Sequence, residues 1–330
     1  MNFLVIGIGS AGQRHLRVLH KFFGNQATKY VYRGNHKRGL ISEDLKNEDL
    51  ALDPIGHYNA VEIISMDALS EINWDLVVIA TPPDSHYFYV EKIIKNSKKI
   101  IIEKPLTVDL SEALKVLSLA ELNNIPVLVG YQMTFHPFMV FIKENLHLIG
   151  GITSCSTEFS EDLSCMNPFR SMHNHYLSKP SGGGAFLSLS HDLDFVLSIF
   201  DQTTSEDISF TKNTYSNVGL LVECNLDTTV NFGIDKIELA SKFSLLPGIK
   251  CKTGKIQGLK ACIEWDFLNC ISEIKDANGK TIKSLSLVVD KDELFQRQID
   301  KILSLKEFDH YCKSNLARAK FIVEANTKIQ

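Results

Sequence analysis

The chain has 330 residues, of which 44% are hydrophobic and 22% charged, and its formal net charge is -4 at pH 7. This composition is typical of a globular protein, and the length exceeds what one hydrophobic core usually supports, so we expect two domains. The charge balance gives no basic footprint for nucleic acid, and no apolar run reaches membrane-spanning length. Seven cysteines without a C-x-x-C pair indicate free thiols, and Met1 leads directly into an apolar strand, so we expect a cytoplasmic protein that binds neither nucleic acid nor membrane.

The first predicted element is an apolar strand that leads directly into Gly7-Ile8-Gly9-Ser10-Ala11-Gly12 and then a helix. In such a G-x-G-x-x-G turn the first glycine permits a tight turn, the second lets the backbone approach a pyrophosphate, and the third lets helix pack on strand. The helix N-terminus would favour the phosphate charge. We predict a dinucleotide site here, against the alternative of a merely structural glycine turn.

Residues 1–130 alternate between strands and helices, which predicts a doubly wound parallel sheet covered on both faces. The predicted strands cover residues 1–6, 29–32, 61–64, 75–80, 99–102 and 125–130, and the predicted helices cover residues 13–23, 85–96 and 110–122. The polar stretch 36–47 is predicted to be helix or loop.

Residues 131–330 lack this alternation, and their turn signals predict an α+β domain built on an open, mostly antiparallel sheet. The predicted strands cover residues 152–159, 219–224, 228–232, 262–265 and 285–288, with a hairpin turn at 276–279. The predicted helices cover residues 138–148, 186–200, 294–305 and 317–326, and the last two can pack back on the first domain.

Two polar motifs follow strands of the predicted parallel sheet, at the edge where such sheets bind ligands. Thr81-Pro82-Pro83 follows one strand, with His86 just beyond, and Glu103-Lys104-Pro105 follows the next. The prolines alone are explained as strand-ending turns, and Lys104 alone as a solvated surface lysine. Its position directly after a buried strand instead favours a role toward the cofactor.

A second-domain motif begins at Gly182-Gly183-Gly184 and continues into a predicted helix that carries Ser188, His191, Asp192 and Asp194. His191 follows Ser188 by three residues, so both can face one side of a helix. Either the acids simply favour the positive end of the helix dipole, or His191 is a general acid or base opposite the cofactor. Spacing alone leaves both readings open.

The irregular stretch 162–184 is expected to border the interdomain cleft. His173-Asn174-His175 has no paired cysteine or carboxylate, so we predict no metal site and favour substrate contact or plain loop polarity. Tyr176 in the same stretch is a candidate substrate contact.

In this order, the glycine turn, Thr81-Pro82-Pro83 with His86, Glu103-Lys104-Pro105, and the triple glycine leading to His191 resemble the Gfo/Idh/MocA oxidoreductase family over nearly the whole chain. The resemblance implies an N-terminal Rossmann domain and a C-terminal domain whose open sheet is often used in oligomerisation, here as a homodimer or homotetramer. It also implies a nicotinamide cofactor and oxidation or reduction of a sugar carbon.

Within this resemblance, Lys104 corresponds to the family's catalytic lysine, whose cation would polarise the reacting oxygen, and His191 to its acid–base histidine. Ser188 stands where relatives commonly have Asp, and Asp192 could take that part. The expected cofactor-binding residues are Gly7, Gly9, Ser10, Ala11, Gly12, Arg33, Arg38, Thr81, Pro82, His86, Glu103 and Lys104. The expected substrate-binding residues are Lys104, His136, Tyr176, Ser188 and His191.

Cofactor choice depends on the end of the second strand, where NAD sites usually carry an acid for the ribose hydroxyls. Arg33 stands there instead, with Arg38 nearby. An arginine attracts a 2′-phosphate, so we predict NADP(H) in preference to NAD(H); the alternative is that Arg33 is only a solvated loop charge.

Residues 190–194 and 133–137 resemble a branch of the family found with bacterial surface-sugar genes, including nonulosonic sugar pathways, although Thr134 stands where that branch often has Arg. An amino sugar, free or nucleotide-linked, is therefore an expected substrate. Two alternatives remain open: a catalytically idle nucleotide- or sugar-binding regulatory protein, which Ser188 favours, and a redox-neutral enzyme with a tightly bound cofactor.

Overall fold

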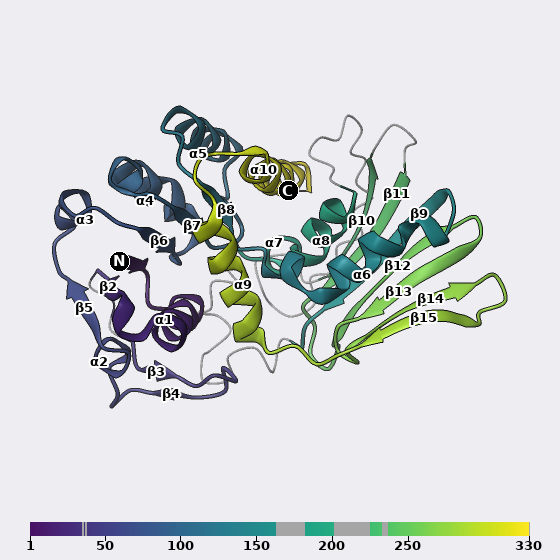
Figure 1. Cartoon of the computed structure of the whole chain (residues 1–330), viewed down its shortest axis with the longest axis horizontal. Coiled ribbons are helices and arrows are strands. Elements are labelled where there is room, and N and C mark those ends of the chain that lie inside the picture. The colour runs from purple at the N-terminus through teal and green to yellow at the C-terminus, as the bar shows by residue number, and fades with distance from the viewer. Residues whose placement is uncertain (35, 37, 163–181, 201–224, 233–236, 330) are drawn as a thin grey trace.

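The computed structural model describes residues 1–34, 36, 38–162, 182–200, 225–232 and 237–329. The predicted strand 219–224 and the residues His173, His175 and Tyr176 lie outside the described part. Two sheets form the two halves of the molecule, and helix α9 (Lys291–Ser304) runs between them (Figure 1).

The first sheet is six-stranded and wholly parallel, in the order β5-β2-β1-β6-β7-β8. This is the 3-2-1-4-5-6 order of dinucleotide-binding doubly wound folds, as the alternation of elements predicted. Its strands are β1 (Asn2–Ile6), β2 (Thr28–Tyr32), β5 (Ala60–Ile63), β6 (Leu76–Ile79), β7 (Ile100–Ile102) and β8 (Val127–Val129).

Helices cover both faces of this sheet, which explains why its strands are continuous apolar runs. Alternate strand residues pack on α1 (Ser10–Phe23) and α9 on one side, and on α4 (His86–Ile93), α5 (Leu110–Leu122) and α10 (His310–Ile329) on the other. The short helices α2 (Pro54–His57) and α3 (Ala68–Glu71) complete this half.

The stretch predicted as helix or loop contains a short strand instead. β3 (Leu40–Ile41) pairs with β4 (Glu48–Asp49) as a small antiparallel hairpin. Gln13 of α1 holds it, because its Nε2 donates to the Gly39 carbonyl oxygen at 2.8 Å and its Oε1 accepts from the Ile41 N–H at 2.8 Å. The buried side chain of Gln13 therefore holds a hairpin that the polar sequence of this stretch did not indicate.

The second sheet has seven strands in the order β10-β11-β9-β12-β13-β14-β15. All neighbours are antiparallel except β9 and β11, so the open, mostly antiparallel sheet is confirmed. The strands are β9 (Ile152–Ser160), β10 (Asn225–Phe232), β11 (Ile237–Ser244), β12 (Cys251–Gly258), β13 (Ala261–Asp266), β14 (Ile271–Asp276) and β15 (Thr281–Ser286).

Strands β11, β12 and β14 were not predicted, and β12 shows why. Lysines and glycines make it a poor strand by propensity, but tertiary pairing overrides propensity. Gly254 lies under the ring of Trp265 on β13, where an added Cβ would be 2.1 Å from the ring atom Cζ2. The neighbouring strand, not the local sequence, therefore requires this glycine.

Helices α6 (Pro137–Asn145), α7 (Ala185–Leu189) and α8 (His191–Ile199) belong to the second half. The single helix predicted over residues 186–200 is wrong, because it breaks at Ser190. The Ser190 hydroxyl donates to the Leu187 carbonyl oxygen at 3.0 Å, a back-bond that bends helices. The break separates Ser188 from His191.

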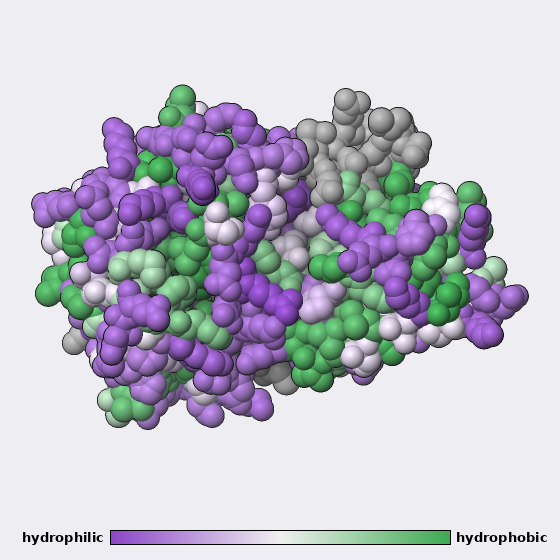
Figure 2. All heavy atoms as spheres, viewed as in Figure 1, coloured by the Kyte–Doolittle hydropathy of each residue, from purple (hydrophilic) through white to green (hydrophobic). Residues whose placement is uncertain are grey.

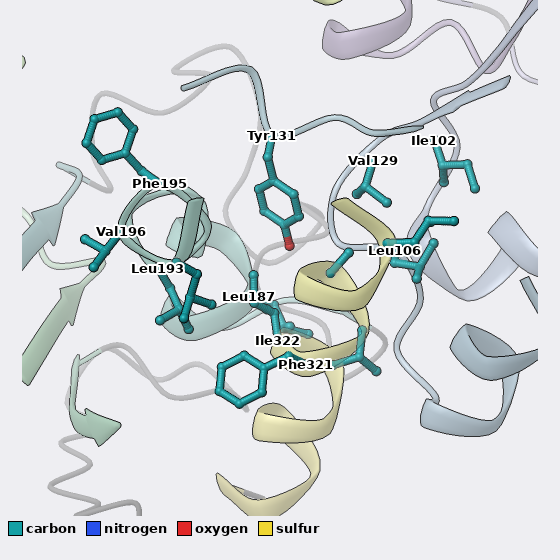
Figure 3. Close-up of a cluster of buried hydrophobic side chains, with 14 of the residues drawn as sticks. Ile102, Leu106, Val129, Tyr131, Leu187, Leu193, Phe195, Val196, Phe321 and Ile322 are labelled. Atoms are coloured by element: carbon teal, nitrogen blue, oxygen red, sulfur yellow. The ribbon is translucent and has the colours of Figure 1, made fainter. Parts of the chain in front are cut away.

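The final helices pack on the first sheet. Arg17 of α1 donates two hydrogen bonds to Asp292 of α9, at 2.8 and 2.6 Å, in a buried ion pair. Figure 3 shows Ile322 of α10 beside Leu187 of α7, in an apolar cluster that also contains Val129 of β8 and so joins the two halves. The division at residue 130 stays a prediction. No described helix is long and apolar enough to cross a membrane.

Candidate active site

The glycine turn has the geometry that a dinucleotide requires. Gly7 has a φ of +95°, and a Cβ on it would lie 2.5 Å from the Ala80 carbonyl oxygen; on Gly12 it would lie 2.1 Å from the Gly7 carbonyl oxygen. Gly9 faces open space and begins α1 without a side-chain cap. Packing therefore requires the outer glycines, whereas the middle one leaves a free cradle that fits a pyrophosphate.

The loop after β6 packs directly against this turn. A Cβ on Gly7 would also meet the Thr81 methyl group, at 3.1 Å. His86 is buried, with Nε2 2.9 Å from the Thr81 carbonyl oxygen and Nδ1 3.0 Å from that of Leu106. Burial lowers the pKa of His86. The ring thus ties together the loops after β6 and β7, and its direct contact with a cofactor stays a prediction.

Glu103 directly follows β7 and lies against α1. Its Oε1 is 2.7 Å from Nε2 of His15, and its side chain packs on Gly130. Burial raises the pKa of Glu103, but the hydrogen bond with His15, and then the charges of His15 and Lys104, bring it below its ordinary value. Glu103 therefore anchors the helix that begins at the glycine turn, and its predicted cofactor contact remains untested.

Lys104 reaches from the first half to the second. Its Nζ donates to the Ser188 carbonyl oxygen at 2.5 Å. Burial lowers the pKa of Lys104 to about 8, opposed by the charge of Glu103 and reinforced by that of Lys252. The hydrogen-bond acceptor is neutral, so the ammonium charge remains available for a substrate oxygen.

Packing of Gly182 on the first half brings the second-domain motif to the same edge. A Cβ on Gly182 would lie 2.6 Å from Pro83 and 2.9 Å from Val108. Only glycine fits this close approach, in which the φ of Gly182 is +115°.

His191 is the first residue of α8, and its ring packs edge-on against Tyr131 at 5.7 Å between centroids. Its buried Nδ1 has no hydrogen-bond partner among the described residues. Burial, and then the charges of Lys104 and Lys252, lower the pKa of His191 well below its ordinary value. The imidazole is therefore neutral at pH 7 and can accept a proton.

Asp192 points toward the second sheet. Its Oδ2 accepts from the Thr157 hydroxyl of β9 at 2.7 Å, and its Oδ1 accepts from the Leu193 N–H at 2.7 Å. Burial raises the pKa of Asp192 to about 7. The Ser188 hydroxyl is buried without a partner in the described structure. These contacts hold Asp192 against the second sheet, and its expected partnership with His191 stays a prediction.

His136 caps α6. Its Nδ1 accepts from the Phe138 N–H at 3.2 Å, and its ring packs on Phe138 and Phe267. Burial, and then the charge of Arg297, lower the pKa of His136 to about 4. The ring is thus engaged in the helix start, and the predicted substrate contact stays a prediction.

Arg33 at the end of β2 is held by two carboxylates. Its Nε and one terminal nitrogen donate to Glu62 at 2.7 and 3.0 Å, and the other donates to Asp53 at 3.0 Å. The hydrogen bond with Glu62 is the main cause that raises the pKa of Arg33. Arg38 is exposed beside the β3–β4 hairpin. Arg33 is therefore not the free cation that the sequence indicated.

Sequence reasoning missed Lys252 of β12 and Glu161, which form an ion pair near Lys104 and His191. No motif marks this pair, because Lys252 and Glu161 are far apart in the sequence and only the pairing of β12 with β9 brings them together. Arg14 and His15, in contrast, directly follow the glycine turn and could have been noticed. The described residues contain no group of three or more His, Cys, Asp or Glu placed to hold a metal ion.

Comparison with known proteins finds a family model that matches the first half. Residues 1–131 match the GFO_IDH_MocA model, described as oxidoreductase family, NAD-binding Rossmann fold. An uncharacterized oxidoreductase of Synechocystis sp. is 28% identical over 204 residues, which cover 61% of this chain and 52% of the relative. By that alignment the chain spans about half the length of the curated relatives it matches.

Solved structures share the fold of both halves. The UDP-N-acetylglucosamine 3-dehydrogenase of Acidithiobacillus ferrooxidans is 17% identical, with a TM-score of 0.73 over 100% of this chain and 99% of that chain. A super-repressor mutant of Gal80p from Saccharomyces cerevisiae is 15% identical, with a TM-score of 0.76 over 100% and 94%. Residues 1–131 of this protein are thus similar to the Gfo/Idh/MocA oxidoreductases, whose model describes an NAD-binding Rossmann fold.

Proposed function

We propose that this protein is a nicotinamide-dependent oxidoreductase that transfers hydride to or from a carbon of a sugar or sugar derivative. The observation that carries this proposal is the convergence of Lys104 and His191. Lys104 follows β7 at the cofactor edge and bonds to Ser188, and its charge acts on His191 from the other half. A cation and a neutral base, both partly withdrawn from water, are the two groups that alcohol oxidation needs beside a hydride acceptor.

The bound nicotinamide would exchange the hydride. Gly7 to Gly12 would hold its pyrophosphate at the start of α1. In oxidation, the neutral His191 accepts the hydroxyl proton while the Lys104 ammonium stabilises the developing alkoxide, after exchanging the Ser188 carbonyl for the substrate oxygen. In reduction the same proton returns to the new hydroxyl group.

For the predicted use of NADP(H), Arg33 would have to release one of its carboxylate partners and bind the 2′-phosphate instead. Glu62 and Asp53 together bring more negative charge than Arg33 neutralises. We therefore propose that the protein accepts both dinucleotides and that Glu62 limits its preference for NADP(H).

A role in bacterial surface amino-sugar metabolism remains part of the proposal. It is supported by the resemblance of residues 190–194 to that branch and by the shared fold of a UDP-N-acetylglucosamine dehydrogenase. The redox-neutral enzyme, the alternative from the sequence, would use the same site with a nicotinamide cofactor that stays bound through each turnover.

An idle regulatory protein is the second candidate. The buried Ser188 hydroxyl has no described partner, and no carboxylate of the described residues bonds to His191, so the base lacks an orienting group. The Gal80p fold is also shared. This candidate predicts nucleotide binding without turnover.

Self-association through the outer face of the second sheet is also proposed. Helices α6, α7 and α8 lie on the opposite face (Figure 1). The outer face carries a hollow of about 680 Å³ whose lining includes Lys242, Lys255, Glu264 and Glu273. Light scattering of wild type and a Lys242→Glu variant would show whether a dimer forms and whether it weakens.

The test of function is a titration with NADPH and NADH, followed by a panel of free, amino and nucleotide-linked sugars. A change in nicotinamide absorbance with any sugar supports the oxidoreductase. Binding of nucleotide with no reaction across the panel supports the regulatory protein. Conversion of a sugar without added nucleotide and without net absorbance change supports the redox-neutral enzyme.

A further inference from the structure

Lys252 is fixed on the inner face of the second sheet. On β12 it lies opposite Phe159 of β9, and its Nζ is 5.0 Å from the centroid of that ring. Glu161, just beyond β9, forms an ion pair with it. A lysine held by both an aromatic ring and a carboxylate has a defined position, unlike a free surface lysine.

The sheet register places this side chain next to the proposed catalytic pair. Thr157 of β9 bonds to Asp192, which directly follows His191, and Thr157 lies opposite Gly254 of β12. Lys252 is two residues from Gly254 on the same face, which is roughly 7 Å along a strand. In agreement, the charge of Lys252 helps to lower the pKa of both Lys104 and His191.

The acids near this position are already engaged, whereas cations are left over. Asp292 is bound to Arg17, and Glu103 to His15. Arg14, which packs over Phe295, shares Asp292 with Arg17: its Nε is 3.9 Å from Oδ1 of that carboxylate, beyond hydrogen-bond distance.

Lys291 at the start of α9 adds to this surplus. Burial, and then the charges of Arg14 and Lys252, lower the pKa of Lys291. Figure 2 shows a band of hydrophilic residues over α9, between the two halves. A local excess of positive charge in a chain of net charge -4 is a feature of anion sites.

We propose that Lys252 binds an anionic group, a carboxylate or a phosphate, on the sugar substrate, so that the enzyme selects acidic or phosphorylated sugars over neutral ones. This inference rests on the proposed function. The ammonium group of Lys252 has three N–H donors. The ion pair with Glu161 uses part of this hydrogen-bonding capacity, and the other N–H donors can bind the ligand. Glu161 and Phe159 hold the lysine in position before the substrate arrives.

The test uses the full chain loaded with NADPH, which occupies the pyrophosphate cradle. Inorganic phosphate and malonate are titrated by calorimetry into wild type, Lys252→Gln and Lys252→Arg. The matched control is Lys255→Gln, because Lys255 lies on the same strand but the opposite face, in an ion pair with Glu264 at 3.2 Å.

We expect at least one probe to bind wild type and Lys255→Gln equally, about tenfold more weakly to Lys252→Gln, and nearly normally to Lys252→Arg. The probe that binds distinguishes phosphate from carboxylate recognition. Unchanged NADPH affinity in each variant shows that the fold is intact. No binding of either probe to wild type, or equal binding to Lys252→Gln, would overturn the inference.

This readout is independent of turnover. If phosphate or malonate binding depends on Lys252 but no sugar is oxidised or reduced, the anion site stands and the oxidoreductase proposal fails. If a neutral sugar reacts with a kcat/KM equal to that of its uronate and its phosphate ester, the oxidoreductase stands and the anion selectivity is refuted.

Discussion

The Nζ of Lys104 donates a hydrogen bond of 2.5 Å to the backbone carbonyl oxygen of Ser188, 84 positions away in the chain. The bond joins the cofactor edge of the parallel sheet to the helix pair that carries His191. Because the partner is a peptide carbonyl and not a carboxylate, it orients the lysine without neutralising it. A substrate oxygen can replace that carbonyl at no cost in paired charge.

Lys104→Met removes the cation while preserving most of the side-chain volume. We expect kcat to fall by about a hundredfold or more, since a donor to the reacting oxygen is lost, with NADPH affinity nearly unchanged. Stopped-flow turnover and nucleotide titration measure the two effects. Lys98→Met, which removes an exposed lysine paired with Asp75, is the control and should keep full activity. Full activity in Lys104→Met would contradict the assignment.

The pH profile of oxidation should reflect Lys104. Burial lowers the pKa of Lys104 to about 8, so its cation is present below that pH and is lost above it. We expect kcat/KM for oxidation to be nearly constant between about pH 6.5 and 7, where His191 is neutral and Lys104 is charged, to be about halved near pH 8, and to fall about tenfold per pH unit above that.

Lys252→Gln provides an internal check of this profile. It removes a positive charge that lowers the pKa of Lys104, so the falling limb should move to higher pH. Lys255→Gln, on the opposite face of the same strand, should leave it in place. A limb near the ordinary lysine pKa in wild type would argue against Lys104 as the group observed.

Glu62→Gln should change cofactor preference. Arg33 currently gives two hydrogen bonds to this carboxylate, and neutralising it frees the guanidinium for a 2′-phosphate. We expect the ratio of NADPH to NADH affinity to rise about tenfold. Fluorescence titration with both nucleotides measures the ratio, and Glu71→Gln, an exposed change on α3, is the control. An unchanged ratio would mean that Arg33 does not contact the phosphate.

Asp192→Asn separates packing from catalysis. Burial raises the pKa of Asp192 to about 7, above its unfolded value of 3.8, so folding stability from this group is present below the unfolded pKa and is lost as the pH rises toward 7. The variant is neutral at every pH. It should be close to wild type in stability near pH 4 and more stable by roughly 4 kcal/mol at pH 8, measured by urea unfolding.

Activity of the same variant tests the catalytic expectation, because the Asp192 carboxyl contacts Thr157 and not His191. We expect turnover close to wild type. Asp194→Asn is the contrasting control: it breaks the buried ion pair with Arg318, at 2.9 Å, and should lower stability at every pH. Loss of turnover in a stable Asp192→Asn would restore a catalytic role to this carboxyl.

Local sequence determined the first half of this protein. Buried parallel strands are unbroken apolar runs, and the glycine turn follows from steric limits within a few residues, so both can be read from the chain alone. Gly7 and Gly12 are required by contacts that any strand–turn–helix of this type makes. The positions of Lys104 and of the loop at Thr81 follow from the parallel order, which brings the carboxyl ends of strands to one edge.

Tertiary structure decided what those groups meet. Sequence spacing placed Ser188 and His191 on one helix, but the helix is interrupted at Ser190, whose hydroxyl donates to the Leu187 carbonyl oxygen. Arg33 looked like a free cation until β5 supplied Glu62. No sequence motif marks Lys252, because its neighbours come from other strands. The hydrogen-bonded register of the sheet, and not spacing along the chain, sets their positions. Charge and burial depend on what lies nearby in space, and for these residues that information is spread across the whole chain.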